Sequence, residues 1–244
     1  MTIGCIIQAR MGSSRLPGKI LEKIDDTTTV LESVINQVKQ SKLIEKIIIA
    51  TTTLEQDNII EKLCRGIDIP FYRGESIDVL DRYYKCAKDF SISEVVRITS
   101  DNPLIDPELI DQVVKKYINE KLDYACNFIP RTFPYGTEAE IISFEVLEKI
   151  WNEAKKPSER EHVTSYVLNN QKKFKIGKIT CKKDISHYRW TLDRRNDLEL
   201  IQKIIFRIKT KPIILKNILN VFLEDPKLHD INKNNLKGEG YKKS

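Results

Sequence analysis

A stretch near the N-terminus combines small residues with cationic side chains and could bind a polyphosphate. Residues 8–19 read Gln-Ala-Arg-Met-Gly-Ser-Ser-Arg-Leu-Pro-Gly-Lys and follow the apolar run 3–7, which is typical of a buried strand. Glycine and serine let the main chain approach a ligand closely, so that its N–H groups can donate to phosphate oxygens. The cations would offset the phosphate charge, and they are Arg10, Arg15 and Lys19. We therefore predict a phosphate-binding loop; the alternative is an exposed basic loop.

The spacing of this loop differs from two common nucleotide-binding signatures. Six residues from Gly12 read Gly-Ser-Ser-Arg-Leu-Pro, so the second glycine of the G-x-x-x-x-G-K-[ST] pattern is missing. The loop does not match G-x-G-x-x-G either. Both Gly12 and Gly18 allow backbone conformations that are closed to other residues.

Two aspartates at the ends of predicted strands could hold a divalent cation. Asp101 follows the apolar strand 95–98, and Asp193 follows the predicted strand 188–192 and precedes an amphipathic helix. Mg²⁺ is bound through one or two carboxylates together with substrate phosphates. The alternatives are a turn aspartate at Asp101 and a helix cap at Asp193. Asp106 is expected to cap the helix that begins at Pro107.

The loop resembles the signature A-R-x-G-S-x-R-x-P-x-K of the nucleotidyltransferases that activate sugars. The matching positions are Ala9, Arg10, Gly12, Ser13, Arg15, Pro17 and Lys19. Within that superfamily the chain is similar to the cytidylyltransferase family that holds the acylneuraminate and 3-deoxy-manno-octulosonate enzymes. It is most similar to the group named for spore coat polysaccharide biosynthesis protein F. The resemblance covers roughly residues 1–206.

The resemblance implies a nucleotide and metal site. Asp101-Asn-Pro-Leu-Ile and the R-x-T-x-D pattern ending at Asp193 match the places where the family holds its metal, so both aspartates are implied Mg²⁺ ligands. The implied catalytic residues are Arg10, Arg15, Lys19, Asp101 and Asp193. The implied nucleotide-binding residues are Gln8, Ala9, Arg10, Gly12, Ser13, Ser14, Arg15, Lys19, Arg73, Gly74, Asp78, Arg82 and Thr99.

The resemblance also implies an acceptor site. A loop with the pattern Y/F-P-x-G-x-x-x-E borders the acceptor in related enzymes, and the string E-R-E-H-V-T is typical of the group. The implied acceptor-binding residues are Arg131, Tyr135, Gly136, Glu140, Arg160 and His162. From the residues alone, Ser158 and Glu161 could form a capping box, and His162 could be an ordinary partly buried histidine. We do not assign His162 as a general base, because an acceptor that is already an anion needs none.

Strands alternate with helices along most of the chain, which positions these groups. Strands are predicted at 3–7, 45–51, 69–72, 95–98, 123–128, 174–181 and 188–192, and residues 138–141 begin an edge strand. Helices are predicted at 29–40, 58–65, 107–117, 158–164, 198–208 and 214–223. This alternation predicts an α/β, doubly wound, mostly parallel Rossmann-like sheet, of the nucleotide-diphospho-sugar transferase type by resemblance. Residues 1–210 would form this domain with a small lobe at 128–190, followed by a C-terminal helix and polar tail at 211–244.

Composition limits the remaining function classes. The chain has 244 residues, a net charge of +6 and five scattered cysteines without metal-ligand spacing. No apolar run approaches the length of a membrane span, so we expect a cytoplasmic protein with reduced thiols and no membrane partner. The positive charge suits an anionic substrate; nucleic acid is the rival explanation, but the lysines near the C-terminus are typical of a solvated surface. A homodimer is expected by resemblance alone.

Together these observations predict a Mg²⁺-dependent cytidylyltransferase. By resemblance it would use CTP to activate an acidic sugar or a sugar or polyol phosphate, releasing pyrophosphate, in surface polysaccharide or glycan biosynthesis. Two alternatives stay open. The chain could be a nucleotidyltransferase that uses another nucleoside triphosphate, or a non-catalytic protein that binds nucleotides or polyanions.

Overall fold

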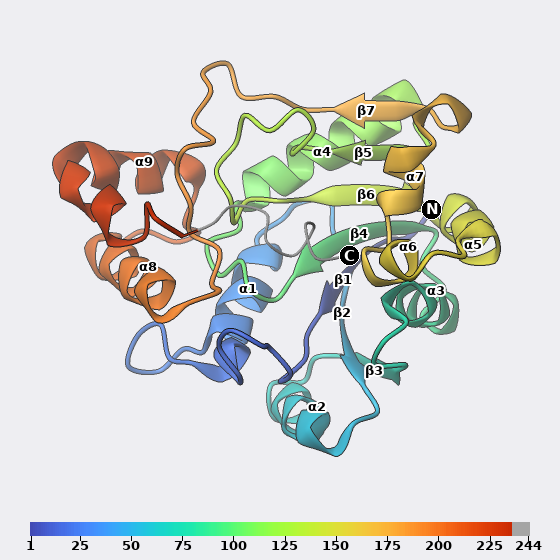
Figure 1. Cartoon of the computed structure of the whole chain (residues 1–244), viewed down its shortest axis with the longest axis horizontal. Coiled ribbons are helices and arrows are strands. Elements are labelled where there is room, and N and C mark those ends of the chain that lie inside the picture. The colour runs from blue at the N-terminus through green and yellow to red at the C-terminus, as the bar shows by residue number, and fades with distance from the viewer. Residues whose placement is uncertain (236–244) are drawn as a thin grey trace.

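A seven-stranded sheet runs through the middle of the molecule in the computed structural model, which describes residues 1–235 (Figure 1). Its order is β3-β2-β1-β4-β6-β5-β7. Neighbouring strands pair in parallel except where β6 lies antiparallel between β4 and β5. The strands are β1 (Ile3–Gln8), β2 (Lys46–Thr52), β3 (Phe71–Gly74), β4 (Glu94–Thr99), β5 (Tyr124–Cys126), β6 (Glu140–Ser143) and β7 (Ile176–Lys178).

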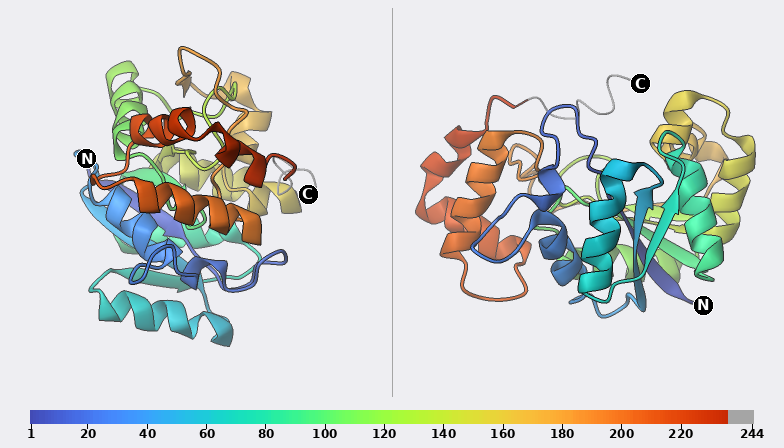
Figure 2. Two further views of the ribbon diagram at one scale, coloured as in Figure 1. Left: turned by 90° about the vertical axis from the view of Figure 1, so that its left-hand side faces the viewer. Right: turned by 90° about the horizontal axis from the view of Figure 1, so that it is seen from below.

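Helices cover both faces of this sheet because successive strand residues point to opposite faces. In β1, Cys5 and Ile7 pack with α1, α2 and α4, whereas Ile6 packs with α3, α5 and α7. Figures 1 and 2 show α1 and α2 on one side of the strands, with α3 and α5 on the other. The prediction of a doubly wound, mostly parallel α/β fold is confirmed. The helices are α1 (Val30–Val38), α2 (Asn58–Gly66), α3 (Val79–Asp89), α4 (Pro107–Glu120), α5 (Phe144–Glu153), α6 (Pro157–Glu161), α7 (Ser165–Asn169), α8 (Arg195–Arg207) and α9 (Leu215–Glu224).

A third apolar cluster joins the C-terminal helices to the N-terminal loop. Leu16 and Val30 pack with buried residues of α8 and α9 and with Leu228 of the 3₁₀ helix η4 (Pro226–Ile231). In Figure 2, left, α8 and α9 lie across this end of the molecule. Residues 211–231, predicted to follow the main domain, therefore pack against it. The predicted polar tail extends to residue 244, and its residues 236–244 lie outside the described part of the chain.

Helix caps confirm one sequence prediction and correct another. The Asp106 carboxylate accepts hydrogen bonds from the backbone N–H groups of Glu108 and Leu109, so it caps α4 as expected. The predicted helix 158–164 with Ser158 as its cap is wrong. Helix α6 begins at Pro157 and ends at Glu161, and Val163 has a positive φ of 51°, which interrupts the chain before α7.

Two strand predictions are also corrected. Residues 188–192 do not form a strand, because their pairing is limited to an isolated bridge between Tyr135 and Arg189. The strand that was expected at a sheet edge is β6, which lies inside the sheet. Its residues Ile141 and Ile142 are buried on opposite faces, so the alternation of apolar and polar residues there did not indicate a solvent-facing edge.

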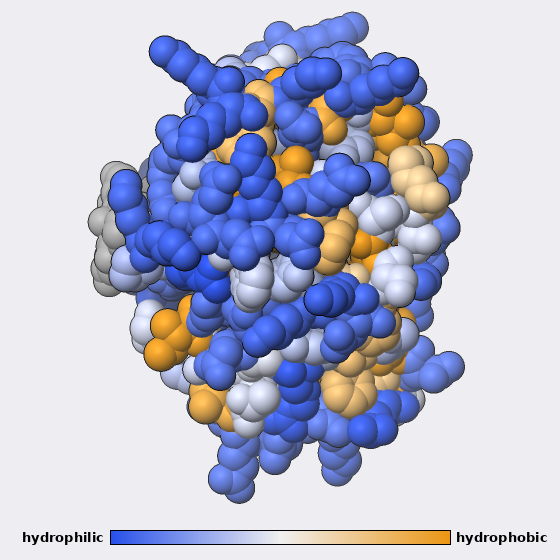
Figure 3. Space-filling view, turned by 90° about the vertical axis from the view of Figure 1, so that its right-hand side faces the viewer, coloured by the Kyte–Doolittle hydropathy of each residue, from blue (hydrophilic) through white to orange (hydrophobic). Residues whose placement is uncertain are grey.

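No helix among the described residues is long and apolar enough to cross a bilayer. The face over α3, α5, α6 and α7 is largely hydrophilic, with apolar residues scattered among polar ones (Figure 3).

Candidate active site

The predicted phosphate loop connects β1 to the 3₁₀ helix η1 (Lys19–Leu21) and is fixed by backbone hydrogen bonds. The carbonyl oxygen of Met11 accepts from the N–H groups of Ser13 and Gly18 at 2.9 and 3.0 Å. The N–H of Met11 donates to the buried Asp57 carboxylate at 2.7 Å. Gly18 has a φ of 72°, the left-handed conformation that favours glycine, whereas Gly12 does not have a positive φ. The loop therefore has a defined shape before any ligand binds.

A cavity of about 420 Å³, lined mainly by polar and charged residues, lies beside this loop. Its floor is at the carboxyl ends of β1 and β4, where Gln8 and Thr99 are paired across the two strands. Ligands of parallel α/β sheets bind at this position, in the crevice beyond the strand ends. The walls come from the phosphate loop, residues 128–140, the end of α6 and residues 189–193.

Lys19 joins the two aspartates that were predicted to share a cation. Its Nζ donates to Asp101 Oδ2 and to Asp193 Oδ1, each at 2.9 Å, so the two oxygens lie within twice that distance of each other. The backbone carbonyl of Asp101 accepts from the N–H of Leu192 at 2.8 Å, which ties the second aspartate's segment to the end of β4. Burial would lower the pKa of Lys19, but Asp101 and Asp193 raise it above its ordinary value, so Lys19 is a cation.

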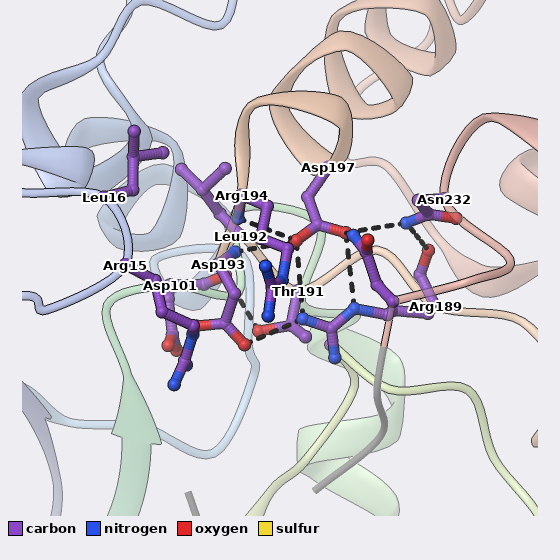
Figure 4. A network of polar contacts seen from close by, with 12 residues as sticks. Arg15, Leu16, Asp101, Arg189, Thr191, Leu192, Asp193, Arg194, Asp197 and Asn232 are labelled. Carbon is purple, nitrogen blue, oxygen red and sulfur yellow. Dashed lines mark hydrogen bonds and ion pairs between the residues drawn. The ribbon is translucent and has the colours of Figure 1, made fainter. Parts of the chain in front are cut away.

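Asp193 is surrounded by cations (Figure 4). Besides Lys19, it pairs with Arg15 at 2.5 Å and with Arg189 at 2.7 Å. Burial would raise the pKa of Asp193, but Lys19, Arg15 and Arg189 hold it well below its ordinary range. The carboxylate is therefore ionised at every physiological pH.

A hydrogen-bonded pair of buried charges forms another part of the cavity. Arg97 donates to Glu140, and through its other terminal nitrogen to the side-chain oxygen of Gln8 at 2.8 Å. Glu140 also accepts from Tyr124 Oη at 2.5 Å and from Thr164 Oγ1 at 2.7 Å. Burial and then Glu140 raise the pKa of Tyr124, so its phenol keeps the proton that it donates. This network fixes the Arg97 guanidinium beside the cavity.

The loop predicted to border the acceptor supplies a second arginine. Arg131 pairs with Glu138 at 2.6 Å and stacks over the Tyr135 ring at 3.8 Å from its centroid. Gly136 donates its N–H to Glu138 at 2.8 Å. Its φ of 103° lets the loop pack directly against the backbone of Trp190. Gly136 thus shapes the loop and does not line the cavity.

Arg82 is a buried cation without a carboxylate partner among the described residues. Its side chain lines the cavity, is 1% exposed and donates to the carbonyl of Glu75 at 2.8 Å. Its Nε has no hydrogen-bond partner in the described chain. Burial first, and the nearby Arg10 among further causes, lower the pKa of Arg82. A bound anion would relieve both effects.

Most of the residues predicted for the site meet in this cavity. Those that line it are Gln8, Ala9, Arg10, Gly12, Ser13, Ser14, Arg15, Lys19, Arg82, Thr99, Asp101, Arg131, Tyr135, Glu140, His162 and Asp193. Arg73, Gly74, Asp78, Gly136 and Arg160 do not.

The predicted residues outside the cavity have structural partners. Arg73 donates to the carbonyls of Thr52 and Leu54 and pairs with Glu61 at 2.8 Å. Asp78 caps α3 and pairs with Arg160 at 2.5 Å, joining α3 to α6.

Sequence reasoning missed several residues that line the cavity. They are Ile20, Val79, Arg97, Ser100, Asn102, Phe128, Glu138, Glu161, Arg189 and Thr191. A signal existed for two of them: Arg97 is a charged residue inside an apolar strand, and Arg189 precedes Asp193 in the R-x-T-x-D pattern.

The donor set at the two aspartates suits a hard cation. Carboxylate oxygens are the ligands that Mg²⁺ prefers, and one or two of them suffice where phosphates complete the shell. The described residues contain no group of three or more His, Cys, Asp or Glu that could hold a metal by itself. A Mg²⁺ ion here would therefore depend on ligands from a bound substrate.

Known proteins resemble this chain over most of its length. The cytidylyltransferase family model matches residues 4–227. The chain is 32% identical to spore coat polysaccharide biosynthesis protein SpsF of Bacillus subtilis over 214 residues, which cover 85% of this chain and 88% of that protein.

Solved structures share the fold. A cytidylyltransferase from Leptospira borgpetersenii superposes with a TM-score of 0.90 and 33% identity, covering 97% of this chain and 99% of that one. CMP:2-keto-3-deoxy-manno-octonic acid synthetase, solved in complex with CTP, superposes with a TM-score of 0.66 over 85% of this chain and 99% of that one. Its sequence identity of 16% supports the fold alone.

Proposed function

Because this chain belongs to the cytidylyltransferase family, we propose that it transfers a cytidylyl group from CTP to an anionic, sugar-like acceptor. An oxygen of the acceptor, either a phosphate oxygen or a hydroxyl oxygen that gives its proton to solvent, attacks the α-phosphorus of CTP and forms a new P–O bond. The bond between the α-phosphorus and its bridging oxygen to the β-phosphate breaks, and its electron pair leaves with pyrophosphate. Positioning and charge neutralisation are the main requirements of such an in-line displacement.

The observation that carries this proposal is the Lys19 contact with both Asp101 and Asp193 beside the phosphate loop. A protein that merely binds polyanions would gain nothing from two carboxylates next to the phosphates. In the proposed reaction, Arg10, Arg15 and Lys19 hold the β- and γ-phosphates and stabilise the leaving pyrophosphate.

A Mg²⁺ ion would be held by Asp101 and Asp193 together with phosphate oxygens. When bound, it supplies Lewis-acid polarisation of the α-phosphate. The chain's own contribution is to hold the two carboxylates close together through Lys19.

The acceptor half of the cavity supports an anionic substrate. Arg97 and Arg131 are held by Glu140 and Glu138, and Arg131 also stacks on the Tyr135 ring, so two fixed cationic groups face an anionic acceptor. We propose an acidic sugar or a sugar or polyol phosphate, used in surface polysaccharide or glycan biosynthesis. The relative SpsF is named for spore coat polysaccharide biosynthesis, which supports the same kind of pathway.

A screen that varies both the nucleoside triphosphate and the acceptor tests the function. The purified protein is incubated with CTP, UTP, GTP or ATP, with Mg²⁺ and a panel of acidic sugars and phosphorylated polyols, and pyrophosphate release is measured. The expected result is release that requires CTP, a specific acceptor and a divalent cation, and that stops with chelator. Release with UTP, GTP or ATP but not with CTP would show that the protein is a nucleotidyltransferase with another base preference. No release with any of the four triphosphates would favour a non-catalytic binding protein.

We also propose a cellular environment and an oligomeric state for this protein. The five cysteines are unpaired, and four of them are buried, which supports a reducing, cytoplasmic environment. A homodimer is proposed by family resemblance, and sedimentation velocity would measure it.

A further inference from the structure

Asp197, in the first turn of α8, is a buried carboxylate that does not reach the cavity but holds the residues that do. It is 0% exposed. Its Oδ2 accepts from the backbone N–H groups of Asp193 and Arg194, both at 2.9 Å. The Arg189 guanidinium contacts Asp197 at 3.3 and 3.4 Å and extends to Asp193 at 2.7 Å. Both the main chain and the side chain of Asp193 are therefore oriented through Asp197 (Figure 4).

The C-terminal segment completes this arrangement from the opposite side. Asn232 is 3% exposed and follows η4. Its Nδ2 donates to Asp197 Oδ1 at 2.8 Å and to the carbonyl of Arg189 at 3.1 Å. Asn235 donates to the same Asp197 oxygen at 2.8 Å. A single amide group thus holds both residues that support Asp193.

We propose that Asn232 is a positioning residue for cytidylyl transfer, so that this residue of the C-terminal segment helps to hold the site in shape. The inference rests on the proposed function, because it takes Asp193 as a group that acts on the triphosphate or its metal. Asn232 does not line the cavity, so its effect passes through Asp197 and Arg189.

The need for such support follows from the charges. Arg15 and Lys19 are expected to turn from Asp193 to the phosphates when CTP binds, which leaves Arg189 as its remaining partner. Arg189 stays in place because the buried Asp197 holds it. Removing a group that hydrogen-bonds to a metal ligand and orients it typically lowers metal affinity or activity by about 10–100-fold.

The test compares Asn232→Ala with Asn217→Ala. Asn217 is also in the C-terminal segment, and its side chain caps α9 by accepting from the N–H of Ile214 at 3.0 Å, without touching Asp197. The first readout is backbone hydrogen exchange of the peptide 189–197 in the ligand-free protein. The second is Mn²⁺ affinity in the presence of CTP, measured by electron paramagnetic resonance. The third is turnover with CTP and the acceptor found by the screen.

For Asn232→Ala we expect the hydrogen-exchange rates of the Asp193 and Arg194 amides to rise by about tenfold or more. The dissociation constant of Mn²⁺ should rise by a similar factor. Turnover falls by a similar factor, while the dissociation constant of CTP without metal changes by less than about threefold, since the loop is intact. Asn217→Ala changes none of these quantities. Unchanged exchange at Asp193 and Arg194, or equal losses in both variants, overturns the inference and makes Asn232 only a packing residue.

A milder variant keeps the test valid if Asn232→Ala does not fold. Asn235→Ala removes a neighbouring donor to Asp197 at a half-buried position and should shift exchange and Mn²⁺ affinity in the same direction, by less. No effect of Asn235→Ala on either quantity would then count against the inference. Failure of the proposed function is distinguishable, because wild-type protein would then lack turnover while the exchange experiment still reports on Asp193.

Discussion

At the scale of single residues, the Asp193 carboxylate pairs with cations that are expected to bind the phosphates of CTP. Arg15 and Lys19, the cations expected to hold phosphates, contact this carboxylate instead. The contacts keep like charges from repelling one another in a partly buried site and keep the cationic side chains extended toward the cavity. A triphosphate would compete with Asp193 for them, so binding should exchange one set of ion pairs for another.

Arg15→Ala should weaken CTP binding, or slow turnover, by more than about tenfold, because a lost charge-assisted contact costs about 1.5–3 kcal/mol. The fold should survive, since Asp193 keeps Lys19 and Arg189 as partners. Isothermal titration with CTP and thermal melting measure the two effects. The matched control is Arg65→Ala, an arginine paired with Glu61 on the surface, which should change neither. Wild-type affinity and turnover in Arg15→Ala would contradict the loop assignment.

Asp101→Asn and Asp193→Asn should each remove most turnover, and the double variant should cost little more than either single one. Residues that act through one shared cation are not additive. Without metal, CTP should bind Asp193→Asn at least as well as wild type, since Arg15 and Lys19 are released toward the phosphates. Asp230→Asn, which removes an exposed carboxylate, is the control. Near-normal turnover in Asp193→Asn would leave Asp101 as the sole metal carboxylate.

At the scale of elements, the apolar patterns predicted the strands and helices that pack on the sheet. The alternating order predicted the fold class, and the family resemblance is confirmed. The exceptions have physical causes. Residues 188–192 look like a strand because Trp190 and Leu192 are apolar, but both are buried in a cluster formed with α8 and α9, not in the sheet. The helix expected at 158–164 stops because Val163 adopts a positive φ, which no propensity predicts.

The site shows a similar division between local and long-range information. A single stretch supplied the phosphate loop, so local sequence was enough to predict it. The side chains of Arg97 and Glu140 come from strands that pair only in the folded sheet, and no local pattern indicates that pairing. Arg160 was assigned to the acceptor from its motif, whereas its contact with Asp78 depends on how α6 packs against α3.

Gly136→Ala tests whether the loop 131–138 must pack against residues 189–191. A Cβ there would lie 2.7 Å from the Thr191 nitrogen and 2.8 Å from the Trp190 carbonyl carbon, at a φ of 103°. The change should destabilise the protein by about 2 kcal/mol or more and lower turnover, because Arg189 lies in the displaced segment. Urea denaturation measures the first effect. Gly66→Ala is the control, since its Cβ would meet open space. Equal stability of the two variants would contradict the close packing.

At the scale of the whole molecule, the chain has a net charge of +6, and more cationic than anionic side chains line the cavity. Cations from the phosphate loop, from α3 and from residue 189 converge on the carboxyl ends of β1 and β4. Three apolar clusters hold the elements that carry these cations, one on each face of the sheet and one beneath α8 and α9. Because the cavity draws on all of these layers, ligand binding should stabilise the chain as a unit.

Ligand-induced stabilisation also tests the base preference, which rests on family resemblance. At about a hundredfold excess over its dissociation constant, a ligand stabilises the folded state by about 2.7 kcal/mol. For a chain of this size that corresponds to a rise in melting temperature of about 5–10 °C.

We expect CTP with Mg²⁺ to produce the largest rise among CTP, UTP, GTP and ATP at equal concentrations. Inorganic triphosphate serves as the control, because it occupies the phosphate loop without a base. If UTP or GTP stabilised the protein more than CTP, the preference for cytidine would be wrong, although the phosphate loop and its nucleotidyltransferase chemistry would stand. Equal rises with triphosphate and with all four nucleotides would mean that the base makes no specific contact in this cavity.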